Sequence, residues 1–490
     1  MLLTGLIILC VLLALSVPVA AVMGVLGMVL NNFYSFMPLH RAMGEIIWNS
    51  SSEYILFAIP LFVMLGEILL RAGIAERAYN AIALWLSWLP GGLMHANIGT
   101  CAMFAATSGS SVATAATVGT VAIPEIKKRG YSESLFLGSI AAGGTLGILI
   151  PPSINFILYG LLTNNSVPRL YLAGFIPGFL LASFFMLIVL FACLIDPAKG
   201  GQRERNLRNP WMSWPLIVIL GIATFAVAEL FLFGRTGFSL DALLEASIWS
   251  AIMGFVVAFW AFIFRREGGP AFRALSDLIP PFIIFLLVIG SIYAGYATPT
   301  EAASLGVVGA LLLATWERKV SFTMLRAVLE GTMRTTGIIM LIILAAQFLN
   351  FVLAAVGATD GIGNAIEALG LGKYGTMLLI VIFYLILGCF METISMMILT
   401  TPFIYPIVIK LGWDPIWWGI VLTILIEAAL ITPPVGLNLY VVQGMRERGP
   451  VADVIRGALP FVGAMMVLVV MLATWPQLAL WLPEYVMGKG

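Results

Sequence analysis

The sequence predicts an all-α polytopic membrane protein with inverted structural repeats, two re-entrant helical hairpins and two helices broken at Pro-Pro pairs. Three observations support this fold class. Hydrophobic residues fill 61% of the 490 positions and charged residues only 10%, whereas a soluble protein needs about a quarter charged residues to cover its surface. The apolar runs lack the alternation of membrane-barrel strands. An internal repeat carries a Pro-Pro pair in each copy.

Composition and motifs exclude several classes of function. The formal net charge of +1 gives no basic surface for a nucleic-acid partner. The patterns GxxxxGKS/T and GxSxG are absent, so we expect neither ATP use nor an enzyme. The apolar run from Leu2 to Leu30 has no basic leading segment, so we expect no cleaved signal peptide. Two histidines are too few for a metal site, and no CxxC pair occurs among Cys10, Cys101, Cys193 and Cys389.

The repeat appears at a fixed spacing along the chain. A shift of 282 residues aligns four features without a gap. Because chance would rarely place prolines in one register so often, we infer two homologous halves, 1–195 and 278–490, joined by a connecting segment, 196–277. The matching pairs are Pro124 and Pro406, Lys128 and Lys410, Gly130 and Gly412, and Pro151-Pro152 and Pro433-Pro434.

Basic residues predict the orientation of the halves. The densest basic loops are cytoplasmic by the positive-inside rule, whereas Lys410 stands almost alone, as expected of a periplasmic loop. Five crossings and one hairpin per half, with two extra transmembrane helices at about 213–234 and 245–264, then give inverted halves. Residues 1–30 fit either one helix kinked at Pro18 or two short spans. The basic loops are Lys127-Lys128-Arg129 and the group Lys199, Arg203, Arg205 and Arg208.

Two hairpins are predicted, at about 91–127 and about 373–410. Legs of ~16 residues, ~24 Å of helix, are short for a full crossing. Irregular backbone at membrane depth is tolerated where it lines a cavity or is buried in protein. Freed carbonyls and hydroxyls suit Na⁺, and helix N-termini suit an anion; the alternative is that small residues only let helices pack closely. The candidate tip residues are Thr107, Ser108, Gly109, Ser110, Ser111, Glu392, Thr393 and Ser395.

A broken helix is predicted to follow each hairpin, at about 132–165 and about 415–444. A Pro-Pro pair in mid-span removes two amide donors and frees carbonyls one turn earlier. A cation facing the hairpin tip is one partner for those carbonyls, and neighbouring Ser or Thr hydroxyls at an ordinary kink are another. The candidate residues are Gly143, Gly144, Thr145, Pro151 and Asn155 in the first half, and Glu427, Thr432, Pro433, Gly436 and Asn438 in the second.

Acidic residues in apolar sequence are costly and usually functional. Glu392 is at a hairpin tip, so we expect it to act at the site, whereas for Glu67 we favour a structural role. Glu301 and Glu427 are further candidates. Proton transfer, cation binding and pairing with a buried arginine such as Arg334 all remain open for these carboxyl groups.

These motifs together resemble those of the large membrane subunit of tripartite ATP-independent periplasmic (TRAP) transporters. The resemblance implies an elevator-type, Na⁺-driven importer of small organic acids in the bacterial inner membrane. It also implies two partners, a four-helix small membrane subunit and a periplasmic solute-binding protein that selects the substrate. The segments that carry it are Ser108 to Thr114, Gly143 to Ser153, Thr298 to Ala303, Gly388 to Ser395 and Ile431 to Asn438, which add Thr298 to the candidate site residues.

Residues 205–268 depart from the common pattern of that family. We expect this stretch to enlarge the contact with the small subunit or to stabilise the scaffold. An alternative function is a stand-alone divalent-anion/Na⁺ symporter of related architecture, which needs no binding protein. A different class, a channel-like or structural membrane scaffold, is disfavoured by the paired hairpins. The residues favour Na⁺ over H⁺ as the coupling ion without separating the two.

Overall fold

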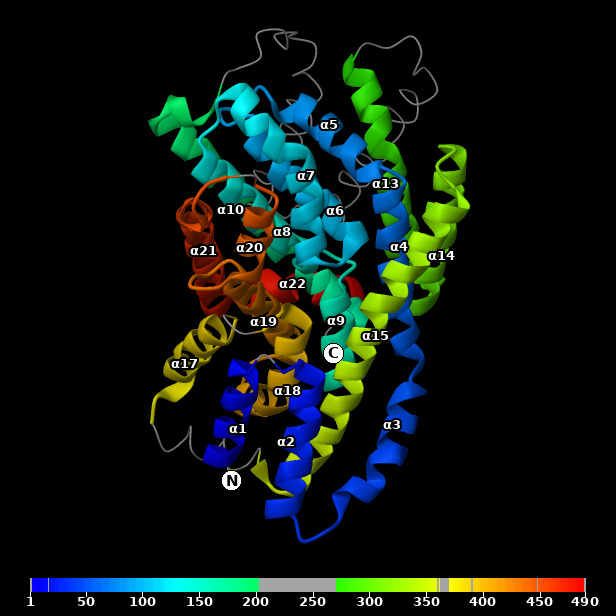
Figure 1. The fold of residues 1–490 in the computed structure, drawn as a ribbon, viewed down its shortest axis with the longest axis vertical. Helices are drawn as coiled ribbons and strands as arrows, with labels where there is room; N and C mark the ends of the chain where they lie inside the picture. The colour runs from blue at the N-terminus through cyan, green and yellow to red at the C-terminus, as the bar shows by residue number, and fades with distance from the viewer. Residues whose placement is uncertain are drawn as a thin grey trace, which may run out of the picture.

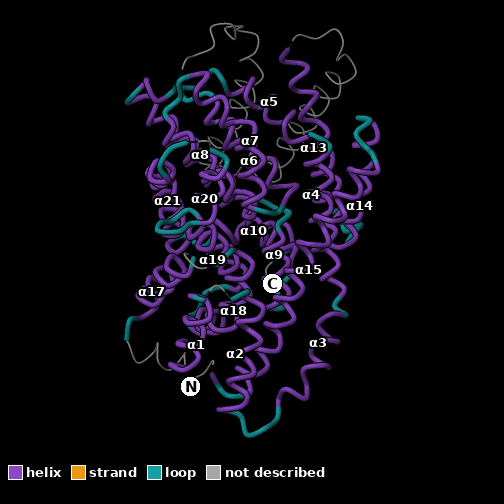
Figure 2. The backbone as a smooth tube through the Cα atoms, in the orientation of Figure 1, coloured by secondary structure: helices purple, strands orange, loops and turns teal. Residues whose placement is uncertain are grey.

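A computed structural model describes residues 2–15, 17–201, 270–358, 361, 370–388, 391–446 and 448–488. Within these ranges the chain is helical with short connections and forms no strand, apart from an isolated bridge between Tyr131 and Gly200 (Figure 2). The extra spans expected at about 213–234 and 245–264 lie outside the described residues. The described part of the protein is therefore all-α.

The described residues before residue 202 form the helices α1 to α10. Pro18 stands between α1 and α2, so residues 1–30 contain two helices rather than one kinked helix. Short 3₁₀ turns at Leu39–Ala42 and Tyr54–Phe57 flank α3. The helices are α1 (Leu2–Ala14), α2 (Val19–Tyr34), α3 (Met43–Ser51), α4 (Ala58–Arg71), α5 (Ile74–Leu86), α6 (Leu93–Ser108), α7 (Ser111–Arg129), α8 (Glu133–Leu149), α9 (Ile154–Thr163) and α10 (Val167–Ile195).

The helices after residue 269 follow a similar order. A long helix, α15, precedes two pairs of shorter ones, and the Pro433-Pro434 pair lies between α19 and α20. The helices are α13 (Pro270–Tyr293), α14 (Pro299–Trp316), α15 (Phe322–Ala355), α17 (Gly372–Leu387), α18 (Thr393–Lys410), α19 (Pro415–Leu430), α20 (Leu437–Gly444), α21 (Val451–Thr474) and α22 (Gln477–Met487).

Length and composition make the chain a multi-pass membrane protein. Among the described residues, six helices are long and apolar enough to cross a membrane, and seven if the bent pair α8 and α9 counts as one span. That pair bends by 45° across the Pro151-Pro152 break. Many large apolar side chains are exposed along the outer helices, which suits contact with lipid.

The centre of the fold is formed by α8 and α19. Every residue from Leu135 to Leu149 and from Ile416 to Leu430 is buried, as expected of helices that are apolar on all sides. Helix α8 packs against α6, α7, α10 and α21, and α19 packs against α17, α18 and α21. Glycine allows the closest of these contacts, because a Cβ on Gly138 of α8 would overlap the backbone of Gly457 on α21.

Two groups of helices can be distinguished by their contacts. The hairpin block comprises α6 to α9 and α17 to α21, arranged around α8 and α19. The outer block comprises α2, α4, α13, α14 and α15, in which α15 packs against α2 and α4 while α14 packs against α4 and α13. Contacts of α15 with α18 and of α4 with α6 and α9 join the blocks. Figure 1 shows α6 and α7 in the upper half of the molecule and α17 and α18 in the lower half.

Candidate functional site

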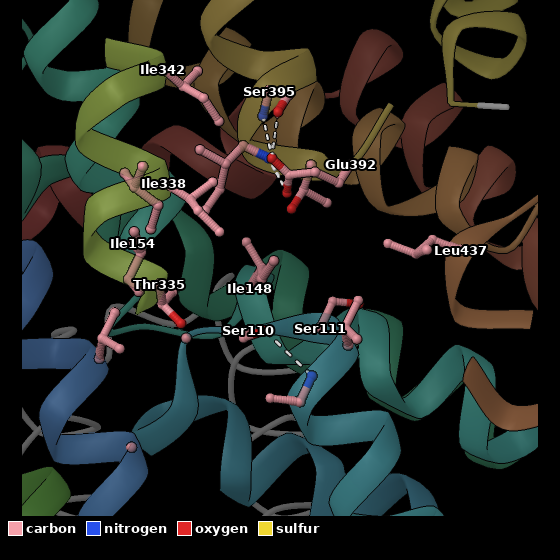
Figure 3. Close-up of a pocket in the computed structure, with 18 of the residues that line it drawn as sticks. Ser110, Ser111, Ile148, Ile154, Thr335, Ile338, Ile342, Glu392, Ser395 and Leu437 are labelled. Carbon is pink, nitrogen blue, oxygen red and sulfur yellow. Dashed lines mark hydrogen bonds between the residues drawn. The ribbon is translucent and has the colours of Figure 1, made fainter. Parts of the chain in front are cut away.

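A cavity of about 600 Å³ lies where the two halves of the chain meet. The turn between α6 and α7 and the start of α18 face each other across it, as Figure 3 shows for Ser110, Ser111, Glu392 and Ser395. Side chains of α2, α4 and α15 form a largely apolar wall. Of the candidate residues, the cavity is lined by Gly109, Ser110, Ser111, Glu392, Thr393 and Ser395.

The first tip is a two-residue turn that begins α7. Gly109 has a φ of 57°, and a Cβ there would lie 3.1 Å from Ile154 Cγ1, so glycine suits both the backbone and the close approach of α9. Ser110 is the N-cap of α7, and its Oγ accepts a 3.3 Å hydrogen bond from the Ala113 amide. Thr107 and Ser108 end α6, and their side chains lie outside the described part of the structure.

The second tip places an acid where the first has a serine. Glu392, 282 residues after Ser110, is the N-cap of α18. Its carboxylate accepts hydrogen bonds from the amides of Ile394, at 3.1 Å, and Ser395, at 2.8 Å, and from Ser395 Oγ at 2.6 Å. A carboxylate at a helix N-terminus is stabilised by the orphan amides and the helix dipole. The two tips therefore present equivalent caps of different charge to one cavity.

The glycines of the first broken helix serve close packing. Helix α7 lies so near α8 that a Cβ on Gly144 would stand 2.7 Å from Ala115 Cβ, and one on Gly147 would stand 2.8 Å from Thr114 Oγ1. A Cβ on Gly143 would meet Cys101 Sγ at 3.0 Å. The Thr145 hydroxyl donates to the Ala142 carbonyl. None of the three candidates in this run, Gly143, Gly144 and Thr145, lines the cavity.

Buried polar groups gather at the two Pro-Pro breaks. Pro151 and Pro433 each lie between the two segments of a broken helix. Asn155, fully buried at the start of α9, has no partner for either amide atom among the described residues, and the same holds for Ser153 Oγ. The first Pro-Pro break thus holds unpartnered buried polar atoms close to the first tip, where Gly109 approaches Ile154.

The second break is built from different residues. Gly436 has a φ of 59°, and a Cβ there would lie 3.0 Å from the Leu430 carbonyl oxygen. The Thr432 hydroxyl donates a 2.6 Å hydrogen bond to the Ala428 carbonyl. Asn438 Nδ2 donates to Ser111 Oγ at 2.7 Å, so the second break contacts the first tip directly.

Two candidate residues lie apart from these groups. Thr298 and Glu301 form a capping box at the start of α14, in which the Glu301 carboxylate accepts from the Thr298 amide at 2.7 Å. Glu301 is exposed, and neither residue lines the cavity. In this structure both therefore begin a helix of the outer block.

The cavity also includes residues that sequence reasoning did not select. Thr335, Ile338 and Ile342 of α15 face the tips (Figure 3), and the available signal was the Thr335-Thr336 pair just before the apolar run that begins at Ile338. Glu67 also lines the cavity, although it pairs with Arg71 at 3.0 Å on its own helix and its carboxyl packs against Gly331. That arrangement is compatible with the structural role favoured for it.

Known proteins match this sequence along nearly the whole chain. The family model for the DctM component of tripartite ATP-independent periplasmic transporters matches residues 6–478. The C4-dicarboxylate TRAP transporter large permease protein of Vibrio cholerae is 29% identical, over 96% of this chain and 95% of that protein. The protein of the same description from Pseudomonas aeruginosa is 30% identical, over 91% and 90%.

A longer relative is similar as well. The isethionate TRAP transporter permease protein DctMQ of Oleidesulfovibrio alaskensis is 29% identical over 94% of this chain, which covers 63% of that protein. These relatives are permease subunits and not enzymes. The chain belongs to the family of the DctM component of tripartite ATP-independent periplasmic transporters, as a multi-pass inner-membrane large permease subunit.

Proposed function

We propose that this chain imports a small organic acid across the inner membrane, driven by Na⁺ and by sliding of the hairpin block against the outer block. The observation that carries the proposal is the meeting of Ser110, Ser111, Glu392 and Ser395 at one cavity between those blocks. The two helix N-termini suit an anionic group of the substrate, and the apolar wall of α4 and α15 suits its carbon skeleton.

Oxygen donors at the tips and breaks fit Na⁺. Ser110 Oγ, the Glu392 carboxylate and the backbone carbonyls freed at the Pro-Pro breaks are hard ligands, the type that hard cations prefer. No group of three or more His, Cys, Asp or Glu residues suited to a metal is found in the described ranges. Bound Na⁺ would supply positive charge beside an anionic substrate, and the two hairpins would orient it.

The organic acid is proposed by analogy with the relatives. Two of them are named for C4-dicarboxylates and one for isethionate, which are small organic anions. A cavity of about 600 Å³ accepts molecules of that size. The isethionate permease protein carries both M and Q in its name, DctMQ, and is longer than this chain. We take its extra length as support for a separate small membrane subunit as a partner here. A periplasmic solute-binding protein is the second proposed partner.

Uptake into proteoliposomes tests the coupling. Ser110→Ala and Thr432→Val remove one oxygen each at nearly constant volume, and loss of one ligand should raise the half-maximal Na⁺ concentration by about tenfold. The controls Ser183→Ala and Thr315→Val remove hydroxyls that, like that of Thr432, donate to the carbonyl four residues earlier, and they lie on exposed faces of α10 and α14. Uptake that ignores Na⁺ and follows the pH gradient would overturn Na⁺ coupling.

A stand-alone symporter is the alternative, and partner dependence separates the two. Proteoliposomes that hold this chain alone should take up free substrate poorly. Uptake should require the small subunit and the solute-binding protein together, and the coupling test therefore includes both. Rapid uptake of free substrate by this chain alone would favour the symporter.

A further inference from the structure

Arg334 on α15 carries a positive charge that no described side chain neutralises. It is exposed, and it forms no ion pair or hydrogen bond within the described ranges. The previous basic residue of the helix, Arg326, is by contrast paired with Glu330 at 2.7 Å. The buried pairing of Arg334 with an intramembrane carboxyl group, one of the roles considered from the sequence, is therefore wrong for the described residues.

The helical repeat places Arg334 on the face of α15 that lines the cavity. Ile338 and Leu341 follow it by four and seven residues, the spacing of side chains on one helix face. Both line the cavity, and Figure 3 shows Ile338 facing the tips. Arg334 itself is not among the lining residues, so it stands at the edge of the cavity, ~6 Å along the helix from Ile338.

The charges around the cavity give this position a role. Among the described lining residues the charged side chains are Glu67 and Glu392, both acidic, and neither attracts an anion. Residues 335–355 carry no charge, and such a stretch of ~31 Å is long enough to cross the hydrocarbon core. Arg334 therefore stands where the polar beginning of α15 gives way to this apolar stretch, at the point where a solute entering along α15 leaves water.

We propose that Arg334 captures the anionic group of the substrate at the edge of the cavity and so selects anions over cations. A guanidinium group binds a carboxylate through two parallel hydrogen bonds, and it stays charged at any physiological pH. A fixed positive charge at the entrance of a cleft also raises the local concentration of anions. This inference rests on the organic acid of the proposed function and adds a residue that neither the tips nor the Pro-Pro breaks supply.

Charge-selective thiol labelling tests the proposal without requiring the substrate. Ile338→Cys, in a background without native cysteines, places a reporter in the cavity one turn from Arg334. The purified full chain reacts with the anionic sulfonatoethyl and the cationic trimethylammonioethyl methanethiosulfonates, and the ratio of the two rates is measured. Arg334→Gln should lower this anion-to-cation ratio by about fivefold or more, because a unit charge ~6 Å away acts on the two reagents with opposite sign. Arg334→Lys retains the charge and should keep most of the ratio.

Arg326→Gln is the matched control. It removes the same charge from the same helix, but ~18 Å before Ile338, which exceeds the Debye length of ~8 Å at physiological ionic strength. Its rate ratio should equal that of the unsubstituted reporter. An unchanged ratio in Arg334→Gln would show that the guanidinium reaches lipid headgroups instead of the cavity, and would overturn the proposal.

Uptake measurements separate this inference from the proposed function. For an anion that the proteoliposomes take up, Arg334→Gln should raise the KM about tenfold and leave the maximal rate nearly unchanged. If the labelling ratio depends on Arg334 but no organic anion is taken up, the proposed substrate class is wrong and the anion-attracting role of Arg334 stands. If organic anions are taken up and Arg334→Gln alters neither the ratio nor the KM, only the role of Arg334 is wrong.

Discussion

The phenolic hydroxyl of Tyr159 donates a 2.6 Å hydrogen bond to the carbonyl oxygen of Pro415. Tyr159 is fully buried on α9, and Pro415 is the first residue of α19. The ring also packs against the backbone of Gly419, where a Cβ would lie 2.7 Å from Tyr159 Cε1. One side chain therefore ties the broken helix of the first half to the central helix of the second.

Removing that hydroxyl should loosen the hairpin block. Tyr159→Phe keeps the ring but removes the hydrogen bond to the half-buried Pro415 carbonyl, which should cost about 0.5–1.5 kcal/mol. The exposed Tyr440 on α20 provides the control Tyr440→Phe. Unfolding in detergent, followed by size-exclusion chromatography after heating, should show a lower Tm for Tyr159→Phe only. Equal Tm values for both variants would show that the contact contributes nothing.

The crossing of α8 and α21 should tolerate no side chain at its centre. A Cβ on Gly457 would overlap the Ser134 carbonyl, so Gly457→Leu should force the helices apart at a cost of about 1–3 kcal/mol or more. Gly463 on the same helix is exposed and has no atom within 4 Å of an added Cβ. The yield of monodisperse protein should therefore fall for Gly457→Leu and remain normal for Gly463→Leu.

Local chemistry explains why several features of the fold can be predicted. Proline lacks an amide proton and disfavours the continuation of a helix, so Pro18, Pro151-Pro152 and Pro433-Pro434 indicate interruptions, although Pro124 and Pro406 lie inside α7 and α18. The structure has α1 and α2, α8 and α9, and α19 and α20 on either side of these residues. Polar side chains at the turn of a predicted hairpin likewise indicated Ser110, Ser111, Glu392, Thr393 and Ser395. All five line the cavity.

Tertiary relationships could not be predicted in this way. Asn438 and Ser111 are 327 positions apart, and nothing in either local sequence specifies their hydrogen bond. The wall formed by α15 depends on how that helix packs against α18, which composition does not reveal. A local pattern can also suggest a site where there is none. Glu301 is an acid in an apolar run, but it forms a capping box with Thr298 and does not line the cavity.

Orientation in the membrane remains a prediction that chemical labelling can test. Lys127 and Lys410 are both exposed, at the ends of α7 and α18. If the halves are inverted, a cysteine at Lys127 should react with an impermeant maleimide only from the cytoplasmic side. A cysteine at Lys410 should react only from the periplasmic side. Reaction of both from the same side would exclude inverted halves.

Sliding of the hairpin block requires that α15 and α18 change their contact during transport. Ile338 of α15 and Ile394 of α18 both line the cavity, and these helices pack together. Ile338→Cys with Ile394→Cys, joined by a short reducible thiol crosslinker in a background without native cysteines, should therefore stop uptake. Reduction should restore it, and each single variant should remain active after the same treatment.

A crosslink between α1 and α2, which follow each other in the chain and pack together, provides the control for this experiment. Thr4 on α1 is half-buried and Tyr34 on α2 is exposed, and their side-chain oxygens lie 2.7 Å apart. Because α1 and α2 pack together, the pair Thr4→Cys and Tyr34→Cys joins helices that are not expected to separate. Crosslinking this pair should leave uptake unchanged. If the Ile338 and Ile394 pair transported at the normal rate while fully crosslinked, the two blocks would have to move together, and a sliding mechanism at this seam would be wrong.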